Sequence, residues 1–546
     1  MELHELFLVA VYEVKQQGRS WVFRFFAFLS LVGIVACHMY WQGQGADNWK
    51  MMALSCSMPL VNAYLYSVMQ SLFLAVMMAD IPRRLGRPGA LDSPRARPAD
   101  NATFYWGTIA GNLLLFGLVN VTVIVVSVFI VNLTSLAPVS WSCYLFYLLT
   151  LNLPSWLFVA GFSLWVSSIS GGRFPAIVLS ATWLAGCLFW LPYHQHGTLD
   201  YTGSGLPNLF SEITGHINLP RYLLHRSAYA LIGMGLLAWS AGRMKRLPNR
   251  RGTGRIHVLG GIALLLVGLT CGVLLESSYY RARSVRSAYR SSFERNWEEA
   301  TCRVKRHVIR LRQSGRVLKA ESDLLVYNPE KESLRQIVLF LNPGLRVVSV
   351  QSGGGDLPYR RDQQFVLIDR ALGPGDTLSL RLKYEGRVDD RYCDLHLPDK
   401  AYEDTFHGDR FFPTGRRGAF TGKNFLLLTP ACTWYPVAIP PVNPFMPLAT
   451  GRDFTLFTLV VENPSQKTIL SQGVPERLKN GVRFTCRNPL NGISLYGANP
   501  RDYRLAVDET FGFEIHSFSL VKELAPIFSG VSRQAFASLW KIPPVM

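Results

Sequence analysis

The chain has 546 residues, of which 49% are hydrophobic and 17% are charged, against about 25% charged in an average soluble protein. Residues 1–275 hold only 18 of the 56 basic and 9 of the 37 acidic residues, so the apolar excess lies in the first half and excludes a single soluble globular enzyme. The net charge of +19 is split almost evenly between the two halves. Neither half combines a basic face with a recognisable nucleic-acid-binding fold, so we expect no nucleic acid partner.

The N-terminal residues 1–23 are expected to form an amphipathic helix in the cytoplasmic interface of a membrane. The residues that share one helical face are Leu3, Leu6, Phe7, Ala10, Val11 and Val14. A helix with one apolar and one charged face suits the boundary between lipid and water. The alternative is that this stretch simply extends the first membrane span.

Seven apolar stretches follow and predict an α-helical membrane domain over residues 24–275. A helix needs about 20 mostly apolar residues to cross the bilayer. The predicted spans are residues 24–41, 52–79, 104–132, 141–168, 174–193, 222–242 and 256–275.

Basic residues in the short loops predict the orientation of these spans, because Lys and Arg resist translocation. The loop after the second span is rich in Arg, and so is the segment 243–255 before the seventh. The loops 42–50 and 133–140 together hold one Lys and no Arg. With seven spans, the N-terminus is cytoplasmic and residues 276–546 lie on the other side of the membrane.

The predicted spans are poor in charge. Their polar side chains are Asn62, Gln70, Asn112, Asn120 and Asn152. For each of these we expect a hydrogen bond to a neighbouring helix. The spans hold no Asp, Glu or Lys of the kind that ion-driven carriers keep at mid-depth, so transport driven by a proton or sodium gradient is disfavoured.

Residues 276–301 are expected to form a juxtamembrane stalk, and from residue 302 the hydrophobic period changes to that of a β-strand. Turn signals such as Asn342-Pro343-Gly344 separate the strands, which predicts an extracytoplasmic all-β sandwich over residues 302–520 and a C-terminal tail over 521–546. The predicted strands are residues 304–311, 316–327, 335–341, 345–350, 364–369, 377–385, 424–429, 453–461, 468–471, 481–486 and 513–518.

The membrane half resembles the permease subunits of ABC-2 type exporters, in which an interfacial helix is followed by six spans. The resemblance rests on that order and on the segments 97–107 and 218–226. It implies that a cytoplasmic loop meets a separate ATPase, through Arg83, Arg84, Arg87, Arg95, Arg97, Pro98, Asp100 and Asn101. It also implies two ATPase copies, a second permease half that is either the same or a different chain, and surrounding membrane lipid.

The chain itself lacks a loop that could hold ATP. A phosphate-binding loop needs G-x-x-x-x-G-K-[ST], whereas Gly422-Lys423 is followed by Asn424 and has Arg417 at the first Gly position. We therefore expect no cofactor in this chain, and the partner ATPase would bind ATP and Mg²⁺.

The outer half resembles the N-terminal β-domain of M1-family zinc aminopeptidases, because five motifs occur in the same order. They are Leu341-Asn342-Pro343-Gly344-Leu345, Leu372-Gly373-Pro374-Gly375-Asp376-Thr377, Lys383-Tyr384-Glu385-Gly386, Thr433-Trp434-Tyr435-Pro436 and Leu470-Ser471-Gln472-Gly473. Nearly the whole chain is thus similar to the bacterial proteins that join an ABC-2 permease to an M1-like region. That resemblance implies a multi-pass protein of the bacterial inner membrane with a periplasmic β-domain.

The residues needed for peptidase chemistry are absent. The motif H-E-x-x-H places two zinc-binding His and a general base Glu on one helix. Only His4-Glu5 occurs here, and Leu8 stands at the second His position. We expect an M1-like region without its catalytic domain, and neither catalytic nor metal-binding residues in this chain.

Two further features of the outer half concern its chemistry and its partners. Its cysteines are Cys302, Cys393, Cys432 and Cys486, which permit two disulfides in an oxidising compartment with three connectivities open. Aromatic and basic residues cluster over 406–413 and at Arg416 and Arg417. This cluster is either a surface for a periplasmic partner or peptide or, as we favour, a loop that folds onto the sandwich.

Three functions are compatible with these features. The leading hypothesis is an ABC-2 type exporter permease that couples ATP hydrolysis by a separate ATPase to outward transport or to motion of its β-domain. The second is a membrane anchor for a separately encoded M1-type peptidase. The third is a scaffold or sensor that transports nothing.

Overall fold

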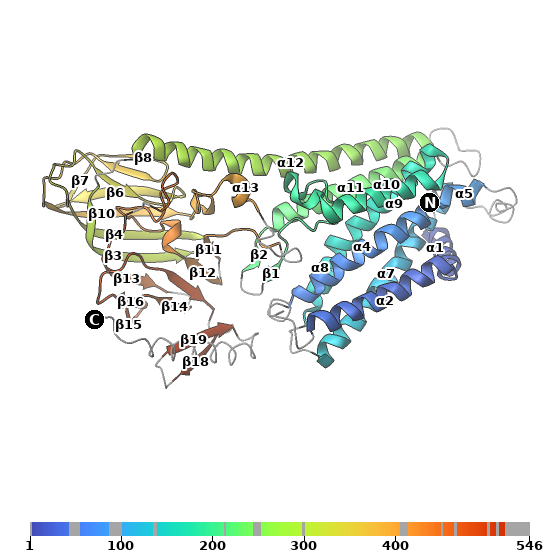
Figure 1. Ribbon diagram of the computed structural model, residues 1–546, viewed down its shortest axis with the longest axis horizontal. Helices are drawn as coiled ribbons and strands as arrows, with labels where there is room; N and C mark the ends of the chain where they lie inside the picture. Colours follow the sequence, from blue (N-terminus) through green and yellow to red (C-terminus); the bar gives the residue numbers. More distant parts are fainter. Residues whose placement is uncertain are drawn as a thin grey trace. The chain divides into compact units, whose positions relative to one another are not determined.

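The computed structural model divides into two compact units, which Figure 1 shows coloured along the sequence. The helical unit comprises Met1–Ser278 and Thr405–Gly415, and the β unit comprises Tyr279–Asp404 and Arg416–Met546. The structure describes every residue except 1–2, 43–54, 87–100, 135–138, 212–213, 244–252, 298–300, 405–412, 423, 449–450, 464–466, 500–502, 509–512 and 519–546.

The described part of each predicted apolar stretch is mainly helical, which confirms the helical first half. The helices are α1 (Leu3–Gly18), α2 (Trp21–Gln42), α4 (Ser57–Ala79), α5 (Ile81–Gly86), α7 (Asn101–Thr134), α8 (Trp141–Tyr147), the π-helical turn η1 (Leu148–Asn152), α9 (Leu153–Ser170), α10 (Arg173–Phe189), α11 (Leu219–Arg243) and α12 (Thr253–Asn296). Between α10 and α11 lie two short 3-10 turns and the hairpin β1 (Phe210–Ser211) and β2 (Gly215–His216).

Several of these helices are long and apolar enough to cross a membrane. By length and composition, four helical segments of the described chain qualify, and α1 with α2 makes a fifth if that bent pair is counted as one span. The helix α10 is shorter, with 17 residues. The helix α11 carries Arg221 and Arg226 near its start and lies outside this set.

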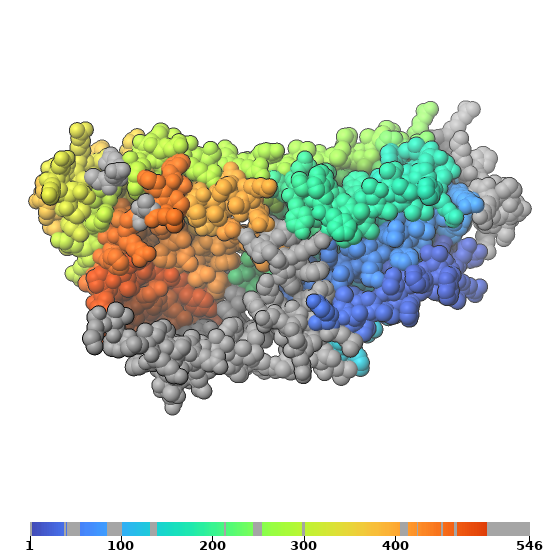
Figure 2. Space-filling model, viewed as in Figure 1, coloured from blue at the N-terminus to red at the C-terminus, as the bar shows by residue number. Residues whose placement is uncertain are grey.

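The helix α1 is separated from α2 by a bend of 78°, so it does not simply extend α2. Its exposed residues include Leu3 and Phe7, at 80% and 60%, and only part of the expected apolar face is covered. The buried side chains of α1 are those of Ala10, Glu13 and Gln17. In Figure 2, α1 and α2 (dark blue) form part of the outer surface of the helical unit.

Glycines set the distance between several helices. A Cβ atom at Gly111 of α7 would lie 2.6 Å from the carbonyl oxygen of Ala10 in α1, so this glycine allows the two backbones to approach. In the same way, a Cβ atom at Gly261 of α12 would lie 2.7 Å from the carbonyl oxygen of Gly235 in α11. Small residues commonly permit such close packing of helices that lack a hydrophobic driving force between them.

The β unit contains sheets of eight, four, three and two strands in its described part. The strands are β3 (Arg303–Ser314), β4 (Val317–Tyr327), β5 (Ile337–Phe340), β6 (Leu345–Ser352), β7 (Gly355–Asp356), β8 (Tyr359–Asp362), β9 (Phe365–Ile368), β10 (Thr377–Gly386), β11 (Ala419–Thr421), β12 (Phe425–Leu428), β13 (Leu456–Glu462), β14 (Thr468–Ser471), β15 (Val474–Leu478), β16 (Gly481–Thr485), β17 (Leu495–Ala498), β18 (Tyr503–Asp508) and β19 (Phe513–Phe518). The eight-stranded sheet has the order β15-β16-β13-β3-β4-β10-β6-β7, and β13 and β3 are parallel.

All eleven predicted strands are present. Alternate side chains of β4 and β10 are buried in a core that they share with β5, β9, β12 and β17, so the eight-, three- and four-stranded sheets pack against one another. Trp434 and Tyr435 are completely buried in this core. Asn342 of the first expected turn motif donates to the carbonyl oxygens of Cys432 and Asp389, at 2.9 and 3.2 Å, and so fixes three segments at one turn.

The sequence pattern missed the short and polar strands. Those missed are β7, β8, β11, β15, β17 and β18. The strand β15 contains Pro475 and is almost wholly exposed, which fits its place at the edge of the eight-stranded sheet. A strand with no buried face carries no alternation of polar and apolar residues to detect.

The close approach of α11 and α12 makes a direct prediction with a control on the same helix. We expect Gly261→Leu to lower the stability of the purified protein by about 1–3 kcal/mol, because the new side chain enters an occupied space. The neighbouring Gly260→Leu should leave stability unchanged or raised, since no atom lies within 4 Å of a Cβ atom there. Thermal unfolding of both variants in the same detergent measures the difference, and equal melting temperatures would contradict the observed packing.

Candidate functional site

The residues implied in contact with an ATPase begin where α4 gives way to α5. Arg83 and Arg84 lie in α5, and Asn101 is the first residue of α7. Arg83 is exposed, whereas Arg84 is half-buried. The remaining predicted contact residues lie outside the described part of the chain: Arg87, Arg95, Arg97, Pro98 and Asp100.

Arg84 lies against a buried carboxylate, that of Glu13 in α1. One carboxylate oxygen of Glu13 accepts hydrogen bonds from Gln17 Nε2 at 2.7 Å, Arg84 Nη2 at 2.9 Å and Asn112 Nδ2 at 3.1 Å. Glu13 is only 5% exposed, and a carboxylate is stable in such a place only when it is paired and hydrogen-bonded. Glu13 therefore connects α1, α5 and α7 at one point, which we call the Glu13 junction.

Two further ion pairs extend the Glu13 junction. Arg84 Nε lies 3.9 Å from Asp80 Oδ2, and Arg173 Nη1 lies 3.3 Å from Asp80 Oδ1. Arg173 is the first residue of α10, so the charges continue from α1 through α5 to α10. Arg173 is half-exposed, which makes this last link the weakest.

Sequence reasoning missed the Glu13 junction because it assigned Glu13 to the polar face of an interfacial helix. A usable signal was present, since Ala10, Glu13 and Gln17 are spaced by three and four residues and share a face. The buried face of α1 is therefore partly polar. It contacts α7 at the two glycines that allow close approach, Gly107 and Gly111.

A second buried charge, Arg226 of α11, also escaped the sequence analysis although it lies in a predicted span. Arg226 is 2% exposed. Its guanidinium donates to the carbonyl oxygens of Thr150 at 3.0 Å, Tyr201 at 2.7 Å and Leu151 at 2.8 Å. Pro154 has no N–H to donate to the Thr150 carbonyl four residues earlier. Arg226 therefore donates a hydrogen bond to a carbonyl oxygen that lacks its usual helical donor.

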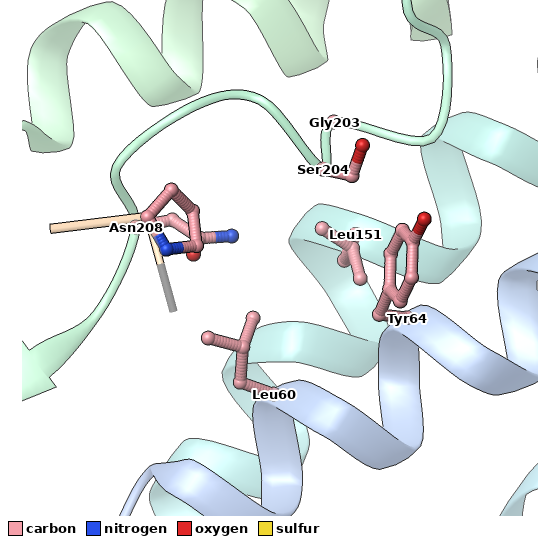
Figure 3. A pocket seen from close by; sticks show the side chains of 7 residues that line it. Leu60, Tyr64, Leu151, Gly203, Ser204 and Asn208 are labelled. Atoms are coloured by element: carbon pink, nitrogen blue, oxygen red, sulfur yellow. The ribbon is translucent and has the colours of Figure 1, made fainter. Parts of the chain in front are cut away.

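A small hollow with room for about one water molecule lies beside this turn, in the helical unit. Figure 3 shows Leu60 and Tyr64 of α4 on one side and Ser204 and Asn208 of the loop before α11 on the other. Leu151, Gly203 and Pro413 complete its lining. Pro413 belongs to the helical unit, so the expectation of a loop folded onto the sandwich is wrong there. It is confirmed at Arg416 and Arg417, which belong to the β unit and pair with Asp394 and Asp390. Residues 406–412 of that cluster lie outside the described part.

The last turns of α12 are anchored within the β unit by arginines. Arg286 is 1% exposed at its side chain, and it donates to the carbonyl oxygens of Arg391 and Cys393 at 2.9 and 2.8 Å. Its guanidinium also lies 3.5 Å from the centre of the Tyr402 ring. Further ion pairs of this part of α12 are Arg283 with Glu403, Arg290 with Asp399 and Arg295 with Asp362.

Two carboxylates next to α12 are held in their charged form. Burial alone would raise the pKa of Asp362, but hydrogen bonds from Asn296 and Arg295 outweigh burial and leave the pKa below its usual value. The pKa of Asp389 is lowered in the same way by hydrogen bonds from Arg391 and Tyr289. These two carboxylates therefore stay charged throughout the neutral pH range.

The cysteines of the β unit are buried. Cys302, Cys393, Cys432 and Cys486 are free thiols in the structure, and the disulfides stay a prediction. Burial raises the pKa of Cys432, like that of Cys302, to about 12, so neither thiol ionises readily. Among the described residues, no three His, Cys, Asp or Glu side chains are grouped so that they could hold a metal ion.

Comparison with known proteins gives a likeness for part of the chain only. An M1 zinc metallopeptidase from Deinococcus radiodurans is 22% identical, with a TM-score of 0.29, over 40% of this chain and 46% of that chain. The leukotriene A4 hydrolase of Saccharomyces cerevisiae is 13% identical, with a TM-score of 0.26, over 40% of this chain and 33% of that chain. The chain thus spans less than half the length of these proteins. No family model matches the chain, and no curated protein matches it.

The Glu13 junction can be tested with two glutamates of the same helix. We expect Glu13→Gln to lower stability by about 1.5–3 kcal/mol, because Arg84 loses a charge-assisted hydrogen bond and Asn112 a charged acceptor. Glu5→Gln removes the same charge from a partly exposed position and should change stability by less than about 0.5 kcal/mol. Denaturant unfolding of both purified variants measures the two effects, and equal effects would argue against the junction.

Proposed function

We propose that the chain is the membrane-spanning subunit of an ATP-driven exporter of the ABC-2 permease type. The observation that carries this proposal is the Glu13 junction, in which one buried carboxylate connects α1, α5 and α7 directly beside the exposed Arg83. A partner that binds the end of α5 could move all three helices together. That is the linkage that a permease without its own ATP site requires.

The proposed topology has seven spans, with α1 in the cytoplasmic interface. Arg-rich segments next to α5 and before α12 favour the cytoplasmic side for both. The spans would then be α2, α4, α7, α8 with α9, α10, α11 and α12. The helix α11 can serve as a span despite Arg226, because protein oxygens accept the hydrogen bonds of that guanidinium.

Energy would come from a separate ATPase that binds ATP and Mg²⁺, since this chain has no phosphate-binding loop. A second permease half, identical or different, would complete the transporter within the lipid of the bacterial inner membrane. The β unit would lie in the periplasm. There it would receive the exported molecule or move with the spans.

The course of α12 supports coupling between the spans and the β unit. The helix is continuous from Thr253 to Asn296, and its last turns are held by Arg283, Arg286 and Arg290. A continuous helix resists bending. Rotation of α12 in the membrane would therefore be passed to residues 393–403, which accept the hydrogen bonds of these arginines.

A second candidate function is a membrane anchor for a separately encoded M1-type peptidase. The order of the turn motifs in the β unit favours it, for example Asn342 at the crossing of three segments. An anchor needs a single span, whereas the buried ion pairs of the helical unit have no evident use in an anchor. We therefore rank it second.

Purification of the native complex in mild detergent separates the two candidates. We expect a Walker-motif ATPase in stoichiometric amount, and about tenfold weaker retention of it by Arg83→Ala, as for a contact worth about 1.4 kcal/mol. Arg316→Ala, at an exposed turn of the β unit, is the matched control and should retain the ATPase fully. Mass spectrometry of the bound proteins gives the result. Recovery of an H-E-x-x-H protein without an ATPase would instead support the anchor.

A further inference from the structure

The polar side chains of the predicted spans fall into two groups. Asn62 donates to Ser127 Oγ at 2.7 Å, Asn152 donates to Ser67 Oγ at 2.9 Å, and Asn112 donates to Glu13, so these three form the expected hydrogen bonds between helices. Gln70 and Asn120 do not. Neither amide atom of Gln70 has a hydrogen-bond partner among the described residues, and the Nδ2 group of Asn120 has none either.

Gln70 and Asn120 are deeply buried, at 0% and 2% exposure. The indole N–H of Trp156 is also without a partner among the described residues, in a side chain that is 5% exposed. Each residue lies near the middle of its own apolar segment: Gln70 in Ser57–Arg84, Asn120 in Asn101–Ile130 and Trp156 in Trp141–Ser170. The three would thus lie near the centre of a bilayer.

The hydrogen bonds between α4 and α9 place Gln70 and Trp156 at one level. Asn152 donates to the carbonyl of Ala63 and to Ser67, and Ser167 donates to the carbonyl of Ala79. These pairs differ by 85 to 89 in residue number, so position 156 is level with positions 67–71 of α4.

Asn120 of α7 lies at the same level as Gln70 and Trp156. A Cβ atom at Gly117 would lie 3.9 Å from the Trp156 ring, which places α7 beside Trp156 at this depth. Asn120 is three residues from Gly117 and therefore on the same face of α7. Three polar groups without partners among the described residues thus lie at one level of α4, α7 and α9, and we call them the mid-depth cluster.

The hydrogen-bonding groups of the mid-depth cluster indicate which kind of molecule they could bind. An unsatisfied polar group in an apolar environment costs several kcal/mol, so two amides and an indole N–H at one level indicate that something else supplies their hydrogen bonds. The amides and the indole offer N–H donors and one carbonyl acceptor, and none of the three carries a charge. They match an uncharged group that mainly accepts hydrogen bonds, such as water, a hydroxyl or a carbonyl.

We propose that Gln70, Asn120 and Trp156 form a hydrated polar site in the middle of the helical unit, which holds water at rest and an uncharged hydrogen-bonding group of the exported molecule during transport. The binding of an exported group at this site rests on the proposed export function. The presence of water at the site does not. A polar group that crosses the membrane would find here its hydrogen-bonding partners at the depth where bulk water is farthest away.

The hydrated site is tested by the reactivity of single introduced cysteines. The cysteine thiolate attacks a methanethiosulfonate, forms a mixed disulfide and displaces methanesulfinate, and the thiolate forms only where water reaches the sulfur. In membranes that contain the full chain, we expect 2-hydroxyethyl methanethiosulfonate to modify Gln70→Cys and Asn120→Cys at least tenfold faster than Leu74→Cys and Val123→Cys. The two controls lie one turn away on the same helices and are equally buried, at 0% exposure. Mass spectrometry reads each cysteine separately, with the native, buried Cys187 as an internal reference.

Equal, slow modification at all four positions would overturn the proposal. A second measurement covers variants that fold poorly. At a dry site, Gln70→Leu removes an unsatisfied amide and should raise the melting temperature, whereas at a hydrated site it removes a partner of bound water and should lower it. Addition of ATP to the complex with its ATPase should alter labelling at position 70. Fast labelling that ATP leaves unchanged would overturn the export half alone, and recovery of an ATPase by the chain tests the proposed function separately.

Discussion

The helical unit depends on one constraint: in an apolar surrounding, every backbone and side-chain polar group must find its partner within the protein. Arg226 shows how strictly this applies. Pro154 leaves the Thr150 carbonyl without its helical donor, and the π-helical turn η1 disturbs the neighbouring carbonyls. The guanidinium of Arg226 donates to Thr150 and Leu151 at once. The charge in α11 therefore stabilises the irregular turn η1, and it finds its hydrogen-bond acceptors there and at Tyr201.

The same constraint explains why donors surround the buried carboxylate of Glu13. The position of the Glu13 junction beside Arg83 relates it to the proposed ATPase contact. Glu13 collects three donors from three helices at the end of the unit where Arg83 is exposed. Glycines at 107 and 111 bring α7 close enough for Asn112 to take part. Because the three donors share one carboxylate oxygen, a displacement of α5 would either break these hydrogen bonds or carry α1 and α7 with it. Other described polar atoms of the helical unit also lack a partner, such as Trp165 Nε1 and Asn208 Oδ1. The mid-depth cluster differs because three such groups lie at one level, and for that reason we interpret it functionally.

Much of the fold follows from sequence patterns, and the exceptions have physical reasons. Long apolar stretches and alternating strands located the helices and eleven strands, because burial imposes a period on side chains. Partners across the chain could not be predicted in that way. Nothing in the sequence around Arg226 indicates that its carbonyl acceptors lie in η1 and in the loop before α11. The polar face of α1 is its buried face at Glu13 and Gln17. Gln70 and Asn152 look alike in sequence, and only the arrangement of helices separates the paired amide from the unpaired one.

The central claim is that the helical unit crosses a membrane an odd number of times, with α5 and the β unit on opposite sides. Side-specific thiol labelling in intact cells tests it most directly, with Ser170→Cys at the end of α9 and Ser314→Cys in the β unit, both conservative changes at exposed positions. The account predicts that an impermeant maleimide labels Cys at 314 in intact cells and Cys at 170 only after the membrane is opened. Labelling of both positions from the same side would contradict the seven-span topology and, with it, an ATPase bound at α5 opposite the β unit.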